Sequence, residues 1–231
     1  MLHSFLYEKR FILLFIALLI PYILHPLKVT EMWGVSIMDL AFSLVLFIGV
    51  FAVSSRRHIA ITALSILVLV QILTWTTHLF SNHSLILTGM VLNAIYLIYT
   101  ATILLMHVVQ RQTVSSETIF ASLCVYVLIG YIWAFFYSFV DDLDPRAFQI
   151  NQNLFEELPI GQHIFSKLYY FLYFSFTTLT TLGYGDILPS SPWTRVLAST
   201  EAMTGQLYLV VLVSRLVGIH ISQSVDGKNR P

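Results

Sequence analysis

Long runs of apolar residues recur along the chain, and within each run the apolar side chains occupy all sides of a helix rather than one stripe. A bilayer core needs about 20 such residues per helix, and apolarity on every side is typical of helices that face lipid. Five stretches meet this requirement: Val35–Val53, Ile59–Phe80, Leu85–Val109, Ile119–Val140 and Val196–Ile221. The pattern therefore predicts an all-α membrane protein.

A sixth apolar run, Phe11–Leu27, is shorter and contains Pro21. Because Lys9 and Arg10 precede it, a cleaved signal peptide is an alternative interpretation. No small residues follow in the spacing of a cleavage site, since Pro21, Tyr22 and His25 occupy that region. We therefore interpret the run as a retained first helix, which brings the prediction to six transmembrane helices.

Composition agrees with this interpretation. Only 10% of the 231 residues are charged, 57% are hydrophobic and the mean hydropathy is +0.80, whereas soluble domains carry about 25% charged residues. A cytosolic enzyme is nearly excluded, and the net charge of zero gives no electrostatic support for binding nucleic acid. The chain carries no nucleotide-binding fingerprint and no nucleophile–base motif, so we expect no enzyme activity.

The basic residues indicate an orientation. With a cytoplasmic N-terminus and six crossings, most of the Lys and Arg residues fall on the cytoplasmic side, while the acidic residues gather in the outer connections. By the positive-inside rule, both termini are expected in the cytoplasm. We expect a multi-pass protein whose environment is the lipid bilayer of a plasma membrane or a bacterial inner membrane.

One segment, 166–189, has a pattern that no simple span explains. It reads SKLYYFLYFSFTTLTTLGYGDILP, which is apolar enough to enter a membrane but ends in Gly183, Tyr184, Gly185 and Asp186. Non-helical backbone at membrane depth persists only where protein buries it or water lines it. We expect a short helix over about 166–180 that dips in from the outside, followed by an extended strand that returns.

Glycine tolerates positive φ at little cost, and glycines at alternating positions allow successive carbonyl oxygens to face one side. A ring of such strands replaces the water around a cation with carbonyl oxygens. The expected ligands are the carbonyl oxygens of Thr181, Leu182, Gly183 and Tyr184, together with the Thr181 hydroxyl. These hard oxygen donors suit alkali cations rather than zinc or copper.

The run from Thr180 to Asp186, Thr-Thr-Leu-Gly-Tyr-Gly-Asp, resembles the selectivity-filter signature of potassium channels, and we call it the filter segment. The resemblance covers about 117–221 as outer helix, pore helix, filter and inner helix. It implies that K⁺ is the permeant ion, that Gly185 belongs to the ion-binding run, and that three identical subunits complete a homotetramer. Leu182 departs from the family, which usually carries valine there.

The resemblance also suggests which residues support the filter: Tyr173, Phe174, Thr177, Thr178, Thr180 and Asp186. Tyr173, Phe174 and Tyr184 resemble the family's aromatic cuff. The Tyr173 hydroxyl is our candidate partner for Asp186. Thr177 stands where some relatives have a glutamate that bonds this aspartate, which is a second departure.

The last helix carries the remaining candidates. Gly205 lies near the middle of the bilayer and serves either as a hinge for opening or as a close-packing position, with neither favoured. Glu201 is an acid within the span, and we expect it to anchor the helix to pore-helix hydroxyls such as those of Ser175 or Thr178. The resemblance implies that one face lines the cavity and gate: Gln206, Leu209, Val213 and Val217.

These predictions divide the chain into a four-helix N-terminal domain over 1–112, a pore domain over 113–222 and a short cytoplasmic tail over 223–231. The span Leu85–Val109 contains no Arg or Lys, so we expect no strong voltage dependence. Asp39 and Asn93 are polar positions in the N-terminal spans that we interpret as structural rather than as a ligand site.

The sequence thus predicts a potassium-selective channel. The alternative is a non-conducting or potassium-transport-associated membrane subunit with a channel-like pore loop. The gating stimulus, the resting state and the role of the first four helices stay open at this point.

Overall fold

The computed structural model describes residues 9–24, 42–50, 57–79, 83–111, 113–150 and 164–228. Helices dominate these ranges, as the apolar runs predict. The elements in chain order are α2 (Arg10–Leu24), α4 (Arg57–Leu79), α5 (His83–Gln110), α6 (Ser116–Leu143), β1 (Phe148–Ile150), α8 (Ile164–Leu179), β2 (Ile187–Pro189) and α9 (Pro192–Lys228), with residues 42–50 helical as well.

Four helices, α4, α5, α6 and α9, are long and apolar enough to cross a membrane, and α2 is a shorter apolar helix. Their bounds lie within a few residues of the predicted runs, apart from α9. Pro21 lies inside α2 without ending it. Of the predicted span Val35–Val53 only 42–50 is described. The described residues thus contain four full-length candidate spans, and the prediction of six extends beyond them.

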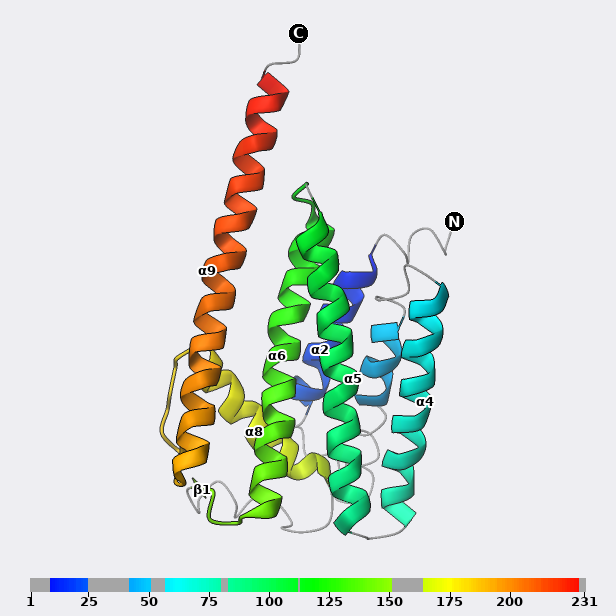
Figure 1. The fold of residues 1–231 in the computed structure, drawn as a ribbon, viewed down its shortest axis with the longest axis vertical. Coiled ribbons are helices and arrows are strands. Elements are labelled where there is room, and N and C mark those ends of the chain that lie inside the picture. Colours follow the sequence, from blue (N-terminus) through cyan, green and yellow to red (C-terminus); the bar gives the residue numbers. More distant parts are fainter. Residues whose placement is uncertain are drawn as a thin grey trace.

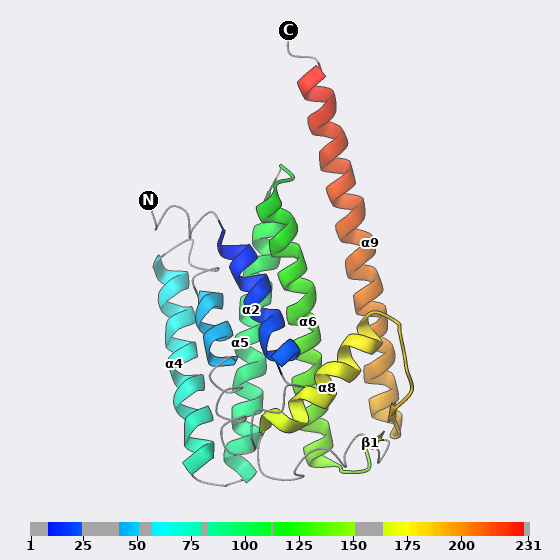
Figure 2. The ribbon, with the colours of Figure 1, turned by 180° about the vertical axis from the view of Figure 1, so that it is seen from behind.

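The long helices pack side by side and run in alternating directions, while α8 crosses them obliquely (Figures 1 and 2). The start of α2 and the end of α9 lie at one end of the bundle, and β1 lies at the other end. α9 stands at the edge and projects beyond its neighbours. Helix α9 continues to Lys228, past Ile221, so much of the predicted tail belongs to the same helix.

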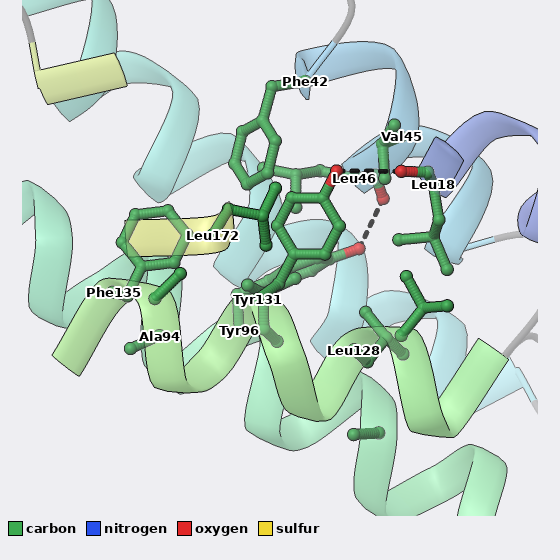
Figure 3. Close-up of a cluster of buried hydrophobic side chains, with 14 of the residues drawn as sticks. Leu18, Phe42, Val45, Leu46, Ala94, Tyr96, Leu128, Tyr131, Phe135 and Leu172 are labelled. Carbon is green, nitrogen blue, oxygen red and sulfur yellow. Dashed lines mark hydrogen bonds between the residues drawn. The ribbon is translucent and has the colours of Figure 1, made fainter. Parts of the chain in front are cut away.

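Buried tyrosines tie the N-terminal helices to one another and to α6 (Figure 3). Tyr131 of α6 is 1% exposed and donates to the Leu18 carbonyl oxygen of α2 at 2.8 Å. Tyr96 of α5 donates to the Leu46 carbonyl oxygen at 2.5 Å. Each hydroxyl has an acceptor, so the rings contribute packing without leaving a buried polar group unpaired.

The start of α9 is tied to the segment that follows α6. Ser191 caps the helix, because its side-chain oxygen accepts from the Thr194 amide at 3.1 Å, and Pro192 occupies the first helical position, where no N–H is needed. The Thr194 hydroxyl donates to the Ala147 carbonyl oxygen at 2.9 Å. Next to this contact β1 and β2 pair antiparallel, with Gln149 opposite Leu188, so both ends of the filter segment are attached to folded structure.

Asn93 has the structural role that we predicted. It is 2% exposed, and its amide donates to the Gly89 carbonyl oxygen at 2.9 Å and to the Thr74 hydroxyl of α4 at 3.3 Å. Asp39 lies outside the described residues.

Candidate functional site

Helix α8 enters the bundle obliquely, and the filter segment returns beside α9 (Figures 1 and 2). The helix ends at Leu179 because the next amides bond back to its last turn. The Thr181 amide donates to the Thr178 carbonyl oxygen at 2.9 Å, and the amides of Leu182 and Gly183 donate to the Thr177 carbonyl oxygen at 2.8 and 3.1 Å. A short helix followed by a non-helical segment that returns beside α9 is therefore present where the sequence predicts a short helix and a returning segment.

These amide contacts set the direction of the carbonyl groups. No cis peptide bond occurs in the described residues, and in a trans peptide the C=O points opposite to the N–H of the following residue. Because the amides of residues 181, 182 and 183 point back to α8, the carbonyl oxygens of Thr180, Thr181 and Leu182 point away from it. Two of the predicted ligand oxygens thus lie on the side of the segment that faces away from α8.

The backbone φ angle alternates in sign along the filter segment. Among the described residues, positive φ occurs at Thr181 (61°), Gly183 (56°) and Gly185 (80°), and at no others. Glycine adopts such angles easily, whereas a β-branched residue such as Thr181 does so at a cost of about 1–3 kcal/mol. Sign alternation at every second residue is the conformation that the two glycines were predicted to permit.

The filter segment is uncovered within the single chain. Leu182 is 56% exposed and Tyr184 67% exposed. A Cβ placed on Gly183 or on Gly185 would meet no atom within 4 Å. The apolar Leu182 and the aromatic Tyr184 are large groups to leave uncovered, so this part of the chain has room for neighbours that the described residues do not supply.

Tyr173 holds the C-terminal end of the filter segment. Its hydroxyl donates to Asp186 Oδ2 at 2.6 Å, and its ring stacks on Tyr184 with centroids 6.3 Å apart and planes 7° from parallel. Asp186 Oδ1 also accepts from the Ile187 amide at 3.1 Å. The predicted hydrogen bond between Tyr173 and Asp186 is therefore present, and one α8 side chain contacts two filter residues.

The other predicted support residues lie around α8 with different partners. Phe174 is buried and packs edge-on against Tyr137, with ring centroids 5.0 Å apart. Thr177 donates to the Phe174 carbonyl oxygen at 2.9 Å, and Thr180 to the Phe176 carbonyl oxygen at 2.6 Å. Thr178 contributes its carbonyl oxygen to the helix end described above. Thr177 thus bonds within its own helix.

Glu201 joins three helices. It is fully buried, at 0% exposure. Its Oε1 accepts from the Ser175 hydroxyl of α8 at 2.5 Å, and its Oε2 accepts from the Tyr137 hydroxyl of α6 at 2.6 Å. Of the two pore-helix hydroxyls that we named, Ser175 is the partner, and Tyr137 was not predicted. The sequence offered no signal for Tyr137, because a tyrosine in an apolar run is unremarkable until its neighbours are known.

Gly205 is a close-packing position in this structure. A Cβ at Gly205 would lie 2.3 Å from the carbonyl oxygen of Leu179, at the end of α8. Backbone cannot rotate away as a side chain can, so any side chain here would force α8 and α9 apart. α9 is a continuous helix through this point. Of the two roles that we left open, packing therefore has direct support.

The predicted cavity and gate positions lie on the uncovered side of α9. Within the single chain Leu209 is 37% exposed, Val213 56% and Val217 51%, and Gln206 is exposed as well. The structure thus brings the filter segment and its supports together around α8, and leaves these four residues facing outward.

An ion pair holds the N-terminal end of α8. Lys167 Nζ lies 2.6 Å from Asp142 Oδ1 and 3.0 Å from Asp141 Oδ2, at the end of α6. Burial opposes the charge of Lys167, but its hydrogen bonds to Asp142 and Asp141 outweigh that cost, so the pKa of the ammonium is raised. The pair joins α6 to the first turns of α8.

Residues 154–220 match a family model described as an ion channel. The chain is also similar to two proteins of Arabidopsis thaliana. It is 44% identical to Two-pore potassium channel 5 over an aligned stretch of 46 residues, and this stretch is 20% of this chain and 11% of that protein. It is also 44% identical to Two-pore potassium channel 4 over an aligned stretch of 45 residues, which is 20% of this chain and 16% of that protein. No solved structure matches this chain.

This chain thus spans a small part of the length of these relatives. The family-model match contains α8, the filter segment and most of α9. Together with the apolar helices, the similarities support an ion-transport protein of potassium-channel type that resides in a membrane.

Proposed function

We propose that this protein is a potassium-selective channel that conducts K⁺ passively through a homotetrameric pore. The observation that carries the proposal is the filter backbone: φ alternates in sign, and the carbonyl oxygens of Thr181 and Leu182 point away from the pore helix. Neutral carbonyl oxygens arranged around an axis can replace the hydration shell of a K⁺ ion. The ion would bind at the carbonyl oxygens of Thr181, Leu182, Gly183 and Tyr184.

One chain supplies one such strand, and a cation needs oxygens on all sides. Four copies around an axis would place Leu182 and Tyr184, which are exposed here, among neighbouring subunits. Cross-linking followed by mass measurement in detergent tests this: a ladder that ends at four subunits is expected, and a complex that ends at two or three would contradict it.

Steep voltage gating needs several charges per subunit within a membrane span, and the fourth predicted span, which α5 contains, has none. α5 contains neither Arg nor Lys, and moving one charge across 100 mV supplies about 2.3 kcal/mol. We therefore propose weak voltage dependence, which recordings in planar bilayers at fixed ion composition test directly.

Conduction is tested with purified full-length protein in liposomes. We expect K⁺-driven flux with little Na⁺ flux. Gly183→Ala places a side chain on a residue with φ of 56°, so it should reduce K⁺ flux at least tenfold because the strand must change conformation. Gly218→Ala is the matched control, since a Cβ there meets nothing within 4 Å and α9 tolerates alanine.

If the wild-type protein carries no flux under any ionic condition yet forms a tetramer, the non-conducting subunit becomes the better interpretation. If Gly218→Ala lowers flux as much as Gly183→Ala does, the filter backbone is not the determining element.

A further inference from the structure

Three polar side chains of α9, Glu201, Tyr208 and Arg215, follow one another at intervals of seven residues. Seven residues are about two helical turns, so the three lie along one side of the helix. Each bonds a different part of the same chain. Glu201 contacts Ser175 and Tyr137 as described, and the Tyr208 hydroxyl donates to the Ser122 carbonyl oxygen of α6 at 2.7 Å. Arg215 forms the third contact, which is the nearest of the three to the C-terminal end of α9.

The guanidinium of Arg215 bonds the end of α5. Its Nη1 donates to the Val108 carbonyl oxygen at 2.5 Å, and its Nη2 donates to the carbonyl oxygens of Val109 at 2.5 Å and Arg111 at 2.8 Å. The last carbonyl groups of a helix have no partner within it and carry the negative end of its dipole. A planar guanidinium with several fixed donors suits such a cluster of acceptors.

The bonded side of α9 lies opposite the predicted gate. Val213 and Val217 are each two residues from Arg215, which corresponds to a rotation of about 200° around the helix. Both valines are more than half exposed within the single chain. Arg215 therefore holds α9 from behind, toward α5, while the valines face the other way.

We infer that Arg215 is a positioning residue by which α5 holds the inner half of α9 away from the pore axis and so favours the open channel. The inference rests on the proposed function. The apolar valines of four subunits gain by leaving water and meeting at the axis, which would close the pore by dewetting. The contact of Arg215 with α5 opposes that convergence, and it gives the N-terminal helices a route to the gate.

The test compares two charge-removing substitutions at the same end of the molecule. Arg215→Gln removes the guanidinium, whereas Arg111→Gln removes a nearby positive charge but keeps the carbonyl oxygen that accepts from Arg215. In single-channel recordings of the full-length protein, Arg215→Gln should lower the open probability about tenfold, the equivalent of about 1.4 kcal/mol, with unchanged unitary conductance. Arg111→Gln should match the wild type.

Arg215→Lys should lie between the two, because an ammonium keeps the charge but lacks the planar set of donors. An unchanged open probability in Arg215→Gln would overturn the inference. So would an equal effect of Arg111→Gln, since charge rather than the contact with α5 would then be responsible.

A second measurement keeps the inference separate from the proposed function. Cys124, the sole cysteine, is replaced by alanine, and Val217→Cys reports access to the inner half of α9 through its rate of modification by a charged thiol reagent. Adding Arg215→Gln should slow this modification severalfold as the helices converge. If the wild-type protein conducts no K⁺, the proposed function fails, but the modification rate at Val217→Cys still tests the role of Arg215. A rate that Arg215→Gln leaves unchanged would overturn that role.

Discussion

Helices α6 and α9 each provide a 28-residue candidate span, yet their surroundings in the structure differ greatly. Half of the most apolar stretch of α6 is buried within the chain, against 6% of that of α9. α6 packs against α2, α5, α8 and α9, whereas α9 packs against α8, α6 and β2. The contrast teaches that apolarity marks a helix as membrane-compatible but does not say whether its neighbours belong to the same chain.

Two buried serines of α6 and three polar side chains of α9 differ in where their partners lie, although the α6 tyrosines Tyr131 and Tyr137 also bond other helices. Ser122 and Ser138 of α6 bond carbonyl oxygens of their own helix, those of Thr118 at 2.7 Å and Ala134 at 2.9 Å. Glu201, Tyr208 and Arg215 of α9 instead reach other elements. These three contacts lie along one side of α9, and the exposed apolar residues on its other side are available to lipid or to the other subunits of the proposed tetramer.

The largest effect on stability is expected at Glu201, a residue of α9 that is fully buried. Glu201→Ala removes the acceptors of Ser175 and Tyr137 and leaves a cavity, which we expect to cost about 2–4 kcal/mol. Tetramer survival during a detergent unfolding titration measures this.

Glu201→Gln is the matched variant. Glutamine keeps an acceptor for Tyr137 and offers an N–H to Ser175, whose own hydrogen then serves the Gly130 carbonyl oxygen 2.8 Å away. We expect assembly and conductance to persist. Should both variants retain wild-type assembly, open probability and pH response, Glu201 is not an anchor.

A leucine pair tests the comparison directly. Leu128 of α6 is 1% exposed, and Leu209 of α9 is 37% exposed. Leu128→Ala should cost about 1–3 kcal/mol in unfolding, at the lower end of the range for buried leucines because lipid is as apolar as the core. Leu209→Ala should leave the unfolding of the single chain nearly unchanged and alter conductance instead. Equal unfolding costs would mean that α9 is as enclosed as α6.

The smallest effect is expected from alanine substitutions at two glycines of α9. Gly205 lies against α8, whereas a Cβ at Gly218 would meet nothing within 4 Å. Gly205→Ala places a Cβ 2.3 Å from the Leu179 carbonyl oxygen. We expect a net loss of about 1–2 kcal/mol after the better helix propensity of alanine is counted. Gly218→Ala should be neutral or slightly stabilising. Thermal unfolding in detergent compares them, and a stabilised Gly205→Ala would show that α8 and α9 can separate here at no cost.

Some features of this protein were determined by the sequence itself. The apolar runs predict the helices because lipid demands an unbroken length of apolar residues whatever the fold. The order Thr-Thr-Leu-Gly-Tyr-Gly-Asp predicts a strand with alternating φ, because positive φ at residues 183 and 185 suits glycine. Such demands are local, so a reader of the sequence can recognise them without knowing any neighbour.

The tertiary structure alone decided which groups meet. Tyr137 as a partner of Glu201, the α5 carbonyl oxygens as acceptors for Arg215, and the Leu179 carbonyl oxygen against Gly205 all come from helices distant in the chain. A seven-residue interval of polar residues in α9 was visible in the sequence, but nothing there named its acceptors. Their identity depends on how helices pack, and in an apolar medium a hydrogen-bonding side chain is satisfied only by the helix that packing brings next to it.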